Sequence, residues 1–302
     1  MNKNHILLTI LLSILTTFAQ ANWLPEKNRT VSVVSGHGPG GTTHLVATWF
    51  ERFLSLKGIP AFVDVKPGAK GQIATAHLSQ QPPNGYSVLM TLGLGMMVHP
   101  DDASDTSKKH SYKDFELITI VGKVPSFLVT RTDNSVKNIT HLMVLPRKKI
   151  SIAYSTETQE ILAKTLAKTL NHDVVVVPYK NNSDVMRDLL GGIIDYAIST
   201  QASSGPYVQQ GKLIAIATTA TGTNVPEFNS TINPLGKDFG ALIGLVAPKG
   251  TPAHILNFYT EVSKEFIQTH KAKFNEVHLN YTDTMFGQKE FLRELLFLES
   301  LL

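Results

Sequence analysis

The segment that most constrains the fold runs from Val31 to Ala47 and reads VSVVSGHGPGGTTHLVA. An apolar, β-branched run passes into glycines and a proline, and an amphipathic helix pattern begins directly afterwards. Such a turn points several backbone N–H groups at one spot, at the positive end of a helix dipole. The segment therefore predicts a strand, an anion-binding turn and a helix in succession.

Strand and helix patterns go on alternating along the rest of the chain, in two clusters. Alternation of this kind predicts parallel sheets covered by helices, and two clusters predict two α/β lobes. Ligands bind beyond the carboxyl ends of strands in such sheets, so a cleft is expected between the lobes. The expected strands are 30–35, 61–65, 86–91, 117–121, 127–130, 150–154, 174–177, 193–199 and 213–218, and the expected helices are 42–57, 71–80, 161–170, 183–190 and one that starts at Thr251-Pro252.

The first residues are expected to be removed from the mature protein. Lys3 and His5 precede an apolar run, Ile6–Phe18, and Ala19-Gln20-Ala21 matches the cleavage pattern of a secretory signal peptide. The run is short for a membrane span, and an uncleaved anchor is the alternative. Cleavage after Ala21 leaves 281 residues (302 less 21), enough for two modest domains.

Composition limits the class of protein further. The chain is 42% hydrophobic and 17% charged, which is typical of a globular protein. It has no cysteine, which excludes disulfides and lipid attachment through an N-terminal Cys. The net charge of +4 falls to +3 without Lys3, and the lysines are scattered, so no nucleic-acid partner is expected.

The glycine turn allows two other interpretations. Gly36, Gly38 and Gly41 fit the G-x-G-x-x-G dinucleotide pattern, and Asp64 follows at the expected distance. Pro39 argues against a nicotinamide enzyme because it removes an N–H from the turn, and an exported protein meets little free cofactor. The remaining interpretation is a glycine turn required only for packing.

No motif indicates catalysis. The chain has no G-x-S-x-G and no H-E-x-x-H, and Ser203-Ser204-Gly205-Pro206 is typical of a serine-capped helix start. The eleven histidines are dispersed, without the spacing of a metal site, although His37 and His44 flank the glycine turn and can approach a ligand there. We therefore expect no catalytic residue, no cofactor and no metal.

Six segments together resemble a known family. The chain is similar to the extracytoplasmic solute receptors of tripartite tricarboxylate transporters, also called the Bug receptors. The matching segments are GHGPGGTTHLVA (36–47), VKPGAKGQIATAHLSQQPPNGYSVLM (65–90), SYKDFELITIVG (111–122), VVVPYKNNSDVMRDLLGGIIDYAIS (175–199), VQQGKLIAIATTA (208–220) and GLVAPKGTPAHIL (244–256).

The resemblance implies a two-lobe periplasmic-binding-protein fold, type II-like, with parallel-rich sheets flanked by helices. Residues 1–21 would be the signal peptide, 22–122 and 242–302 the first lobe, and 123–241 the second. The implied function is the capture of a di- or tricarboxylate or an acidic amino acid by a periplasmic, non-lipidated monomer. Its implied partners are the membrane permease subunits of the transporter.

The resemblance also implies where the ligand binds. In the family, backbone N–H groups of the glycine turn hold the carboxylate together with loops of the second lobe. The candidate ligand-binding residues are Gly38, Pro39, Gly40, Gly41, Thr42, His44, Gly93, Gly95, Ser155, Thr156, Thr158, Tyr179, Lys180, Asn181 and Asn182. Tyr179 is as readily a structural residue of the cleft wall.

Two departures from the family pattern bear on the ligand. His44 stands where the family has Asp, and it would add positive charge when protonated. Glu157 follows the expected strand 150–154 and would repel an anion unless it turns away or binds an amino group of the ligand. Together with the apolar C-terminal end, FLRELLFLESLL, these changes leave open a degenerate receptor with an interaction role. A separate alternative is a ligand sensor that feeds a signalling partner.

Overall fold

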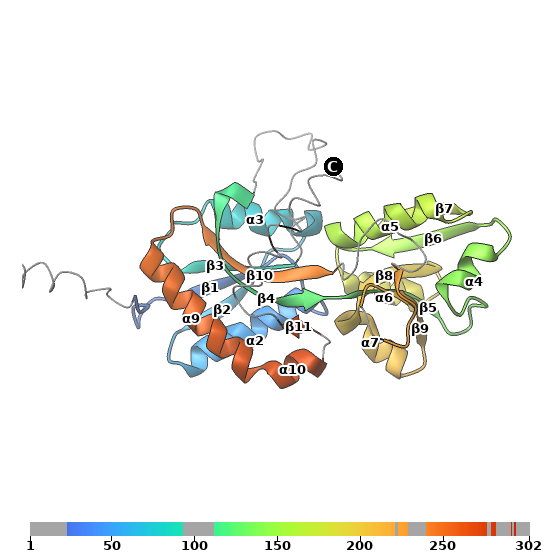
Figure 1. Cartoon of the computed structure of the whole chain (residues 1–302). Coiled ribbons are helices and arrows are strands. Elements are labelled where there is room, and N and C mark those ends of the chain that lie inside the picture. Colours follow the sequence, from blue (N-terminus) through green and yellow to red (C-terminus); the bar gives the residue numbers. More distant parts are fainter. Residues whose placement is uncertain are drawn as a thin grey trace, which may run out of the picture.

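The protein has two lobes, each built on one β-sheet (Figure 1). The computed structural model describes residues 23–92, 112–220, 223–228, 240–276, 279–281, 291 and 293. The six-stranded sheet of the first lobe has the order β11-β4-β10-β3-β1-β2, and the five-stranded sheet of the second has the order β7-β6-β8-β5-β9.

In the first lobe, helices cover both faces of the sheet (Figure 1). Residues of α2 and α9 build the larger core on one face, and residues of α3 pack on the other. The elements of this lobe are β1 (Val31–Ser35), α2 (Thr42–Leu56), β2 (Ala61–Val65), the 3₁₀ turn η1 (Ala69–Gly71), α3 (Gln72–Ser79), β3 (Ser87–Leu92), the 3₁₀ turn η4 (Tyr112–Asp114), β4 (Phe115–Val124), β10 (Ala241–Pro248), α9 (Ala253–Thr269), α10 (Lys271–Glu276) and β11 (Asn280–Tyr281).

The second lobe repeats this layered arrangement. Residues of α4 and α5 pack on one face of its sheet, and residues of α6 and α7 on the other. Its elements are β5 (Ser126–Arg131), α4 (Ile139–Val144), β6 (Lys149–Tyr154), α5 (Glu157–Thr169), β7 (Asp173–Pro178), α6 (Asn182–Leu190), β8 (Tyr196–Thr200), α7 (Gln201–Gln209) and β9 (Leu213–Thr218).

The two-lobe α/β class is confirmed, but parallel pairing covers only part of each sheet. β1 pairs parallel with β2 and β3, and β6 pairs parallel with β7 and β8. β10 runs antiparallel to β3 and β4, and β5 runs antiparallel to β8 and β9. β11 also runs antiparallel to β4. β10 and β5 each follow a crossing from the other lobe, so they enter their sheets from the cleft side and run against the neighbouring strands.

The crossing between lobes is short and internally bonded. β4 ends at Val124, Pro125 follows, and β5 begins at Ser126. Ser126 N donates to Thr219 Oγ1 and Thr219 N donates to Ser126 O, both at 2.9 Å. Gly240 lies so close to this crossing that a Cβ there would be 2.9 Å from Val124 O. The chain segments that cross between the lobes therefore lie close together.

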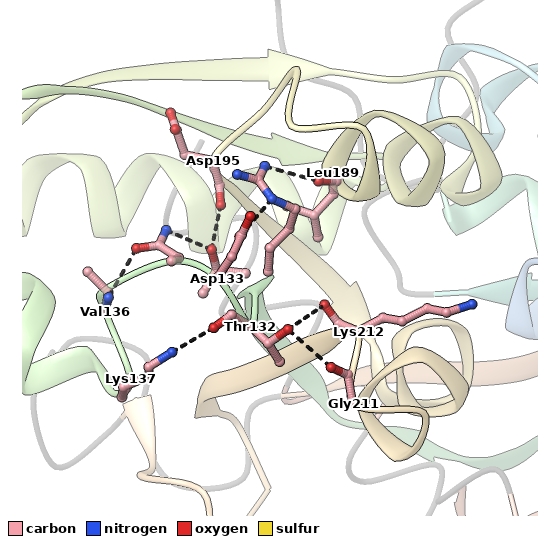
Figure 2. A network of polar contacts seen from close by, with 11 residues as sticks. Thr132, Asp133, Val136, Lys137, Leu189, Asp195, Gly211 and Lys212 are labelled. Atoms are coloured by element: carbon pink, nitrogen blue, oxygen red, sulfur yellow. Dashed lines mark hydrogen bonds and ion pairs between the residues drawn. The ribbon is translucent and has the colours of Figure 1, made fainter.

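A polar network ties down the end of β5 that lies away from the crossing (Figure 2). Thr132 Oγ1 donates to Gly211 O at 3.1 Å, and Arg131 Nε donates to Asp133 Oδ1 at 2.9 Å. Thr130 Oγ1 donates to Asp195 O at 2.8 Å. These bonds connect the end of β5 to the segments before β8 and after α7, within the second lobe.

Some of the element bounds expected from the sequence need correction. The helix expected over 161–170 is α5, which starts at Glu157, and the strand expected over 117–121 extends over Phe115–Val124. The helix expected to start at Ser203 starts at Gln201, and Thr200 is its cap, with Pro206 inside the helix. The strand expected from Ile193 starts at Tyr196, because residues 191–195 form a turn after α6.

Tyr259 on α9 gives a test of the first lobe's core. Its hydroxyl donates to Gly85 O at 2.6 Å and the side chain is fully buried. Tyr259→Phe leaves that carbonyl without this donor, so we expect a loss of about 1–2 kcal/mol in the free energy of unfolding. Urea denaturation measures it. Tyr86→Phe is the control, because its hydroxyl bonds the backbone of exposed Glu26, and an equal loss in both variants would contradict the assignment.

Candidate functional site

The carboxyl ends of strands from both sheets face each other across a small cavity. β1, β3, β6 and β8 each end beside it, and the chain then turns into a helix after three of them. The residues that line the cavity are His37, Gly38, Gly41, Thr42, Leu92, Ser155, Thr156, Gln159, Asn181, Asn182, Thr200 and Ser203. None of these lining residues is an Asp, Glu, Lys or Arg.

Four helices begin at this cavity. The residues that precede α2, α5, α6 and α7 are Gly41, Thr156, Asn181 and Thr200, and each of them lines it. The side chains of Thr156, Asn181 and Thr200 accept a hydrogen bond from the backbone of their own helix. Gly41 has no side chain to do so, and the first N–H groups of α2 are left without a side-chain cap. Four positive dipole ends, one of them uncapped, favour an anion at this place.

The glycine turn touches the second lobe directly. Ser183 Oγ donates to Pro39 O at 3.0 Å, and Ser203 Oγ donates to Gly40 O at 3.1 Å. Gly40 has φ +85°, and a Cβ there would lie 2.5 Å from Ser183 Oγ. The turn thus needs glycine both for its backbone and for the approach of the other lobe.

A buried hydroxyl pair completes the contact between lobes. Thr42 Oγ1 and Thr200 Oγ1 are 2.9 Å apart, and both residues are buried. With the lobes this close, the volume of the cavity that the centre of a water-sized sphere can occupy is about 10 Å³. That is about the room required by one water molecule, so a larger ligand requires the lobes to separate.

His37 is the titratable side chain of the cavity lining. The residue is buried, 6% exposed, and neither ring nitrogen has a hydrogen-bond partner among the described residues. Burial lowers the pKa of His37 to about 4, so the ring is neutral at pH 7. A neutral imidazole offers one N–H donor and one acceptor nitrogen to whatever enters the cavity.

The loop after β6 is held by its own side chains. Gln159 Oε1 accepts from Ser155 N at 2.9 Å and from Ser155 Oγ at 3.2 Å, which fixes the amide beside the cavity. Thr158 is buried and its Oγ1 has no hydrogen-bond partner in the part of the chain that the structure describes, but Thr158 does not line the cavity. The backbone of Glu157 begins α5.

The structure separates the predicted site residues into groups. Those that line the cavity are Gly38, Gly41, Thr42, Ser155, Thr156, Asn181 and Asn182. Tyr179 packs on the core of the second lobe and donates to Asp188 at 2.8 Å, and Lys180 is exposed. Gly93 and Gly95 lie outside the described residues.

His44 belongs to a different hollow. Gly40, Gly41, Thr42 and His44 line a larger groove of about 350 Å³ between α2 and α7, together with Leu45, Thr48, Ala202 and Ser203. Burial lowers the pKa of His44, which disfavours the positive charge expected from the sequence. His44 is not among the residues that line the smaller cavity.

Sequence reasoning missed three polar residues of the cavity: Gln159, Thr200 and Ser203. It expected that His37 could approach a ligand at the glycine turn, and His37 does line the cavity, although it was not among the candidate ligand-binding residues. Thr200 and Ser203 come from the start of α7, where the capping signal was placed three residues too late. The Gln at the third position of α5, after a Thr cap, was a readable signal for Gln159.

Two lobes, each an α/β sheet, with a polar cavity at facing strand ends define the periplasmic-binding-protein fold. The chain matches the tripartite tricarboxylate transporter family receptor over residues 52–281, and it belongs to that family. This is a family of receptors, so the expected resemblance and the expectation of a binding protein without catalysis are confirmed.

Individual relatives agree with this membership. The UPF0065 protein in the TAR-I ttuE-ttuC' intergenic region of Agrobacterium vitis is 28% identical over 276 residues, which cover 87% of this chain and 78% of that protein. A Rhodopseudomonas palustris protein solved with adipate has a TM-score of 0.79 at 20% identity, covering 90% of this chain and 96% of that one. MatC from Rhodopseudomonas palustris, with bound malate, has a TM-score of 0.72 at 20% identity, with coverages of 88% and 98%.

Two features of the described residues bear on other classes of function. In that part of the chain no helix is long and apolar enough to cross a membrane. The same residues contain no group of three or more His, Cys, Asp or Glu side chains placed to hold a metal ion. Asp64, the residue of the dinucleotide alternative, pairs with Lys66 at 3.1 Å.

The buried imidazole of His37 makes stability depend on pH. Because the folded pKa of about 4 lies below the ordinary value of 6.5, the unfolded chain binds the proton first as the pH falls. We therefore expect His37 to reduce the free energy of unfolding progressively between pH 6.5 and 4, by about 3 kcal/mol in total.

Denaturation of the wild type and His37→Gln at pH 7, 5.5 and 4 measures this dependence. Carboxyl groups contribute equally to both proteins, so their difference isolates the histidine. Stabilities of the two proteins that change in parallel over this range would show that the ring is accessible to protons in the folded state.

Proposed function

We propose that the chain is an extracytoplasmic receptor that binds a small carboxylate between its lobes and delivers it to the membrane subunits of a tripartite tricarboxylate transporter. Family membership supports the transport role. Adipate and malate in two structures of similar fold support a carboxylate as the class of ligand. The division of the chain into lobes at 122/123 and 241/242 is part of this proposal.

The observation that carries the proposal is the cavity where four helices begin and no charged residue lines the wall. A site without lysine or arginine binds an anion through backbone N–H groups and helix dipoles, which suits a weakly basic carboxylate. The uncapped start of α2 at Gly41 and Thr42 would receive the carboxylate. Its contacts in the second lobe would be Ser155, Thr156, Asn181, Asn182, Thr200 and Ser203.

His37 would give the site its directional donor. A ring N–H beside the glycine turn can hydrogen-bond one carboxylate oxygen, and the arriving negative charge would favour a second proton on the ring. Gln159 would contribute an amide donor from α5, since its oxygen is already occupied by Ser155. Ligand entry would require rotation about the hinge at Pro125, because the cavity admits about one water.

Export and assembly complete the proposal. Residues 1–21 would direct the chain across the membrane and be removed, and the mature protein would act as a periplasmic monomer without lipid attachment. The supporting features are the sequence of the first residues, the absence of cysteine from the chain and its receptor family.

Gly41→Asp tests the site. A Cβ at Gly41 would lie 3.3 Å from Gly38 O and 3.4 Å from His37 Cβ. The Asp side chain would also place a negative charge where the anionic ligand is expected. We expect affinity for the best ligand among malate, adipate, citrate, glutamate and benzoate to fall at least about a hundredfold, which corresponds to about 2.7 kcal/mol. Isothermal titration calorimetry gives both affinities.

Gly58→Asp is the matched control. It adds the same charge just after the other end of α2, where a Cβ meets nothing within 4 Å. Gly58 has φ +77°, a region that Asp adopts more readily than most side chains, and circular dichroism checks that this variant is folded. Loss of binding in both variants would point to a general charge effect, and unchanged affinity in Gly41→Asp would place the ligand elsewhere. No heat with any of the five acids in the wild type would count against the carboxylate receptor itself.

The predicted cleavage site gives a second test. The protein expressed with its leader in a Gram-negative host and recovered from the periplasm should begin at Asn22, because the Ala19-Gln20-Ala21 site ends there. Intact-mass measurement identifies the first residue. Recovery of the full-length mass from the membrane fraction would instead support an uncleaved anchor.

A further inference from the structure

An ion pair connects the two lobes through residues that are 90 positions apart in the sequence. Lys70 Nζ, from the 3₁₀ turn η1 of the first lobe, bonds Glu160 Oε2, from the first turn of α5 in the second lobe. The Glu160 side chain is only 11% exposed and that of Lys70 is 31% exposed. Water and salt screen such a pair less than a pair on the open surface.

Glu160 is held in place within its own lobe. Its Oε1 accepts from Tyr154 OH at 2.9 Å and lies 2.9 Å from Lys164 Nζ. Burial tends to raise the pKa of Glu160, but the bonds from Lys70, Lys164 and Tyr154 outweigh it and lower the pKa below its ordinary value. The Glu160 carboxylate is therefore ionised at neutral pH, and contacts within its own lobe fix its position.

Lys70 is presented by an unusual backbone. The four consecutive residues Gly68, Ala69, Lys70 and Gly71 have φ of +121°, +43°, +56° and +97°. In the described part of the chain, Ala69 and Lys70 are the two non-glycine residues with positive φ. Side chains disfavour this region, and such residues persist where surrounding contacts hold them, often at switches.

The packing beside the ion pair also spans the lobes. Ile161, next to Glu160, is half-buried and packs against the second lobe's core and against the core on the α3 face of the first lobe. The contacts at the glycine turn join uncharged groups, namely hydroxyls and backbone carbonyls. The ion pair between the lobes thus lies on the side of α3 and α5.

We propose that Lys70 and Glu160 form a clamp that holds the lobes together when the cleft is empty and so controls how often it opens. Both are positioning residues, since neither lines the cavity. A clamp that acts equally on the empty and the filled cleft stabilises both closed forms. It therefore slows ligand entry and release together. The inference concerns the free protein and does not depend on the identity of a ligand.

The absence of cysteine makes a direct test possible. Gln80, at the end of α3 in the first lobe, and Lys168, on α5 in the second lobe, are both exposed. Cysteines at these two positions carry nitroxide spin labels, and double electron–electron resonance gives the distance distribution in the ligand-free protein. In this labelled background we expect one predominant short distance.

Lys70→Gln and Glu160→Gln should each shift the distribution toward longer distances, with the open-to-closed ratio rising about fivefold or more. The double variant should open no further than either single variant, because both remove the same interaction. Lys164→Gln is the matched control, since it removes a lysine bonded to Glu160 within one lobe, and its distribution should stay short.

Circular dichroism checks that each variant is folded, and Lys70→Gln alone decides the question if the more buried Glu160→Gln does not fold. An unshifted distribution in Lys70→Gln overturns the clamp. Equal opening in Lys164→Gln overturns it too, because the effect would then follow from loss of any nearby positive charge.

Discussion

A helix that begins at the end of a strand leaves its first backbone N–H groups unpaired, and in this protein four such ends meet in one small space. The arrangement follows from topology, since β1, β6 and β8 all end beside the cavity. At three of the four helix starts, the side chain of the capping residue accepts a hydrogen bond from one backbone N–H. The fourth, at Gly41, leaves its donors without a capping side chain, and the rest of the cavity is organised around it.

The closeness of the lobes follows from the same turn. Glycine at 40 lets Ser183 and Ser203 reach the backbone carbonyls of the first lobe, and Thr42 meets Thr200 without a charged group between them. The charged contact between the lobes, the ion pair of Lys70 and Glu160, lies outside the cavity. The two sets of contacts therefore have different roles. Uncharged groups shape the cavity, and an ion pair outside it joins one lobe to the other.

Much of this architecture could be predicted from local sequence. The bounds of β2 and β9 agree with the sequence expectation, and α2 differs by one residue, because glycines and alternating apolar residues mark these ends clearly. β10 was not predicted, since Ala241–Pro248 is buried on both faces and its apolar run shows no period. The start of α7 was misplaced because Gly205 and Pro206 lie inside it.

The composition of the cavity was harder to predict than its location. The glycine turn identified the first lobe's contribution, but Thr200 and Ser203 meet it only through the closure of two distant segments. His37 and His44 flank the same turn, and no local pattern distinguishes the ring that enters the cavity from the ring that enters the neighbouring groove. That choice depends on the path of the backbone through Gly38, Gly40 and Gly41.

The place of β10 in the first sheet also sets an order of assembly during synthesis. All five strands of the second sheet come from one continuous stretch, 126–218, whereas β3 and β4 are joined only through β10, which begins at residue 241. A chain made from its N-terminus therefore contains the whole second sheet while the first still lacks a central strand. The lobe that starts the sequence is the last to be completed.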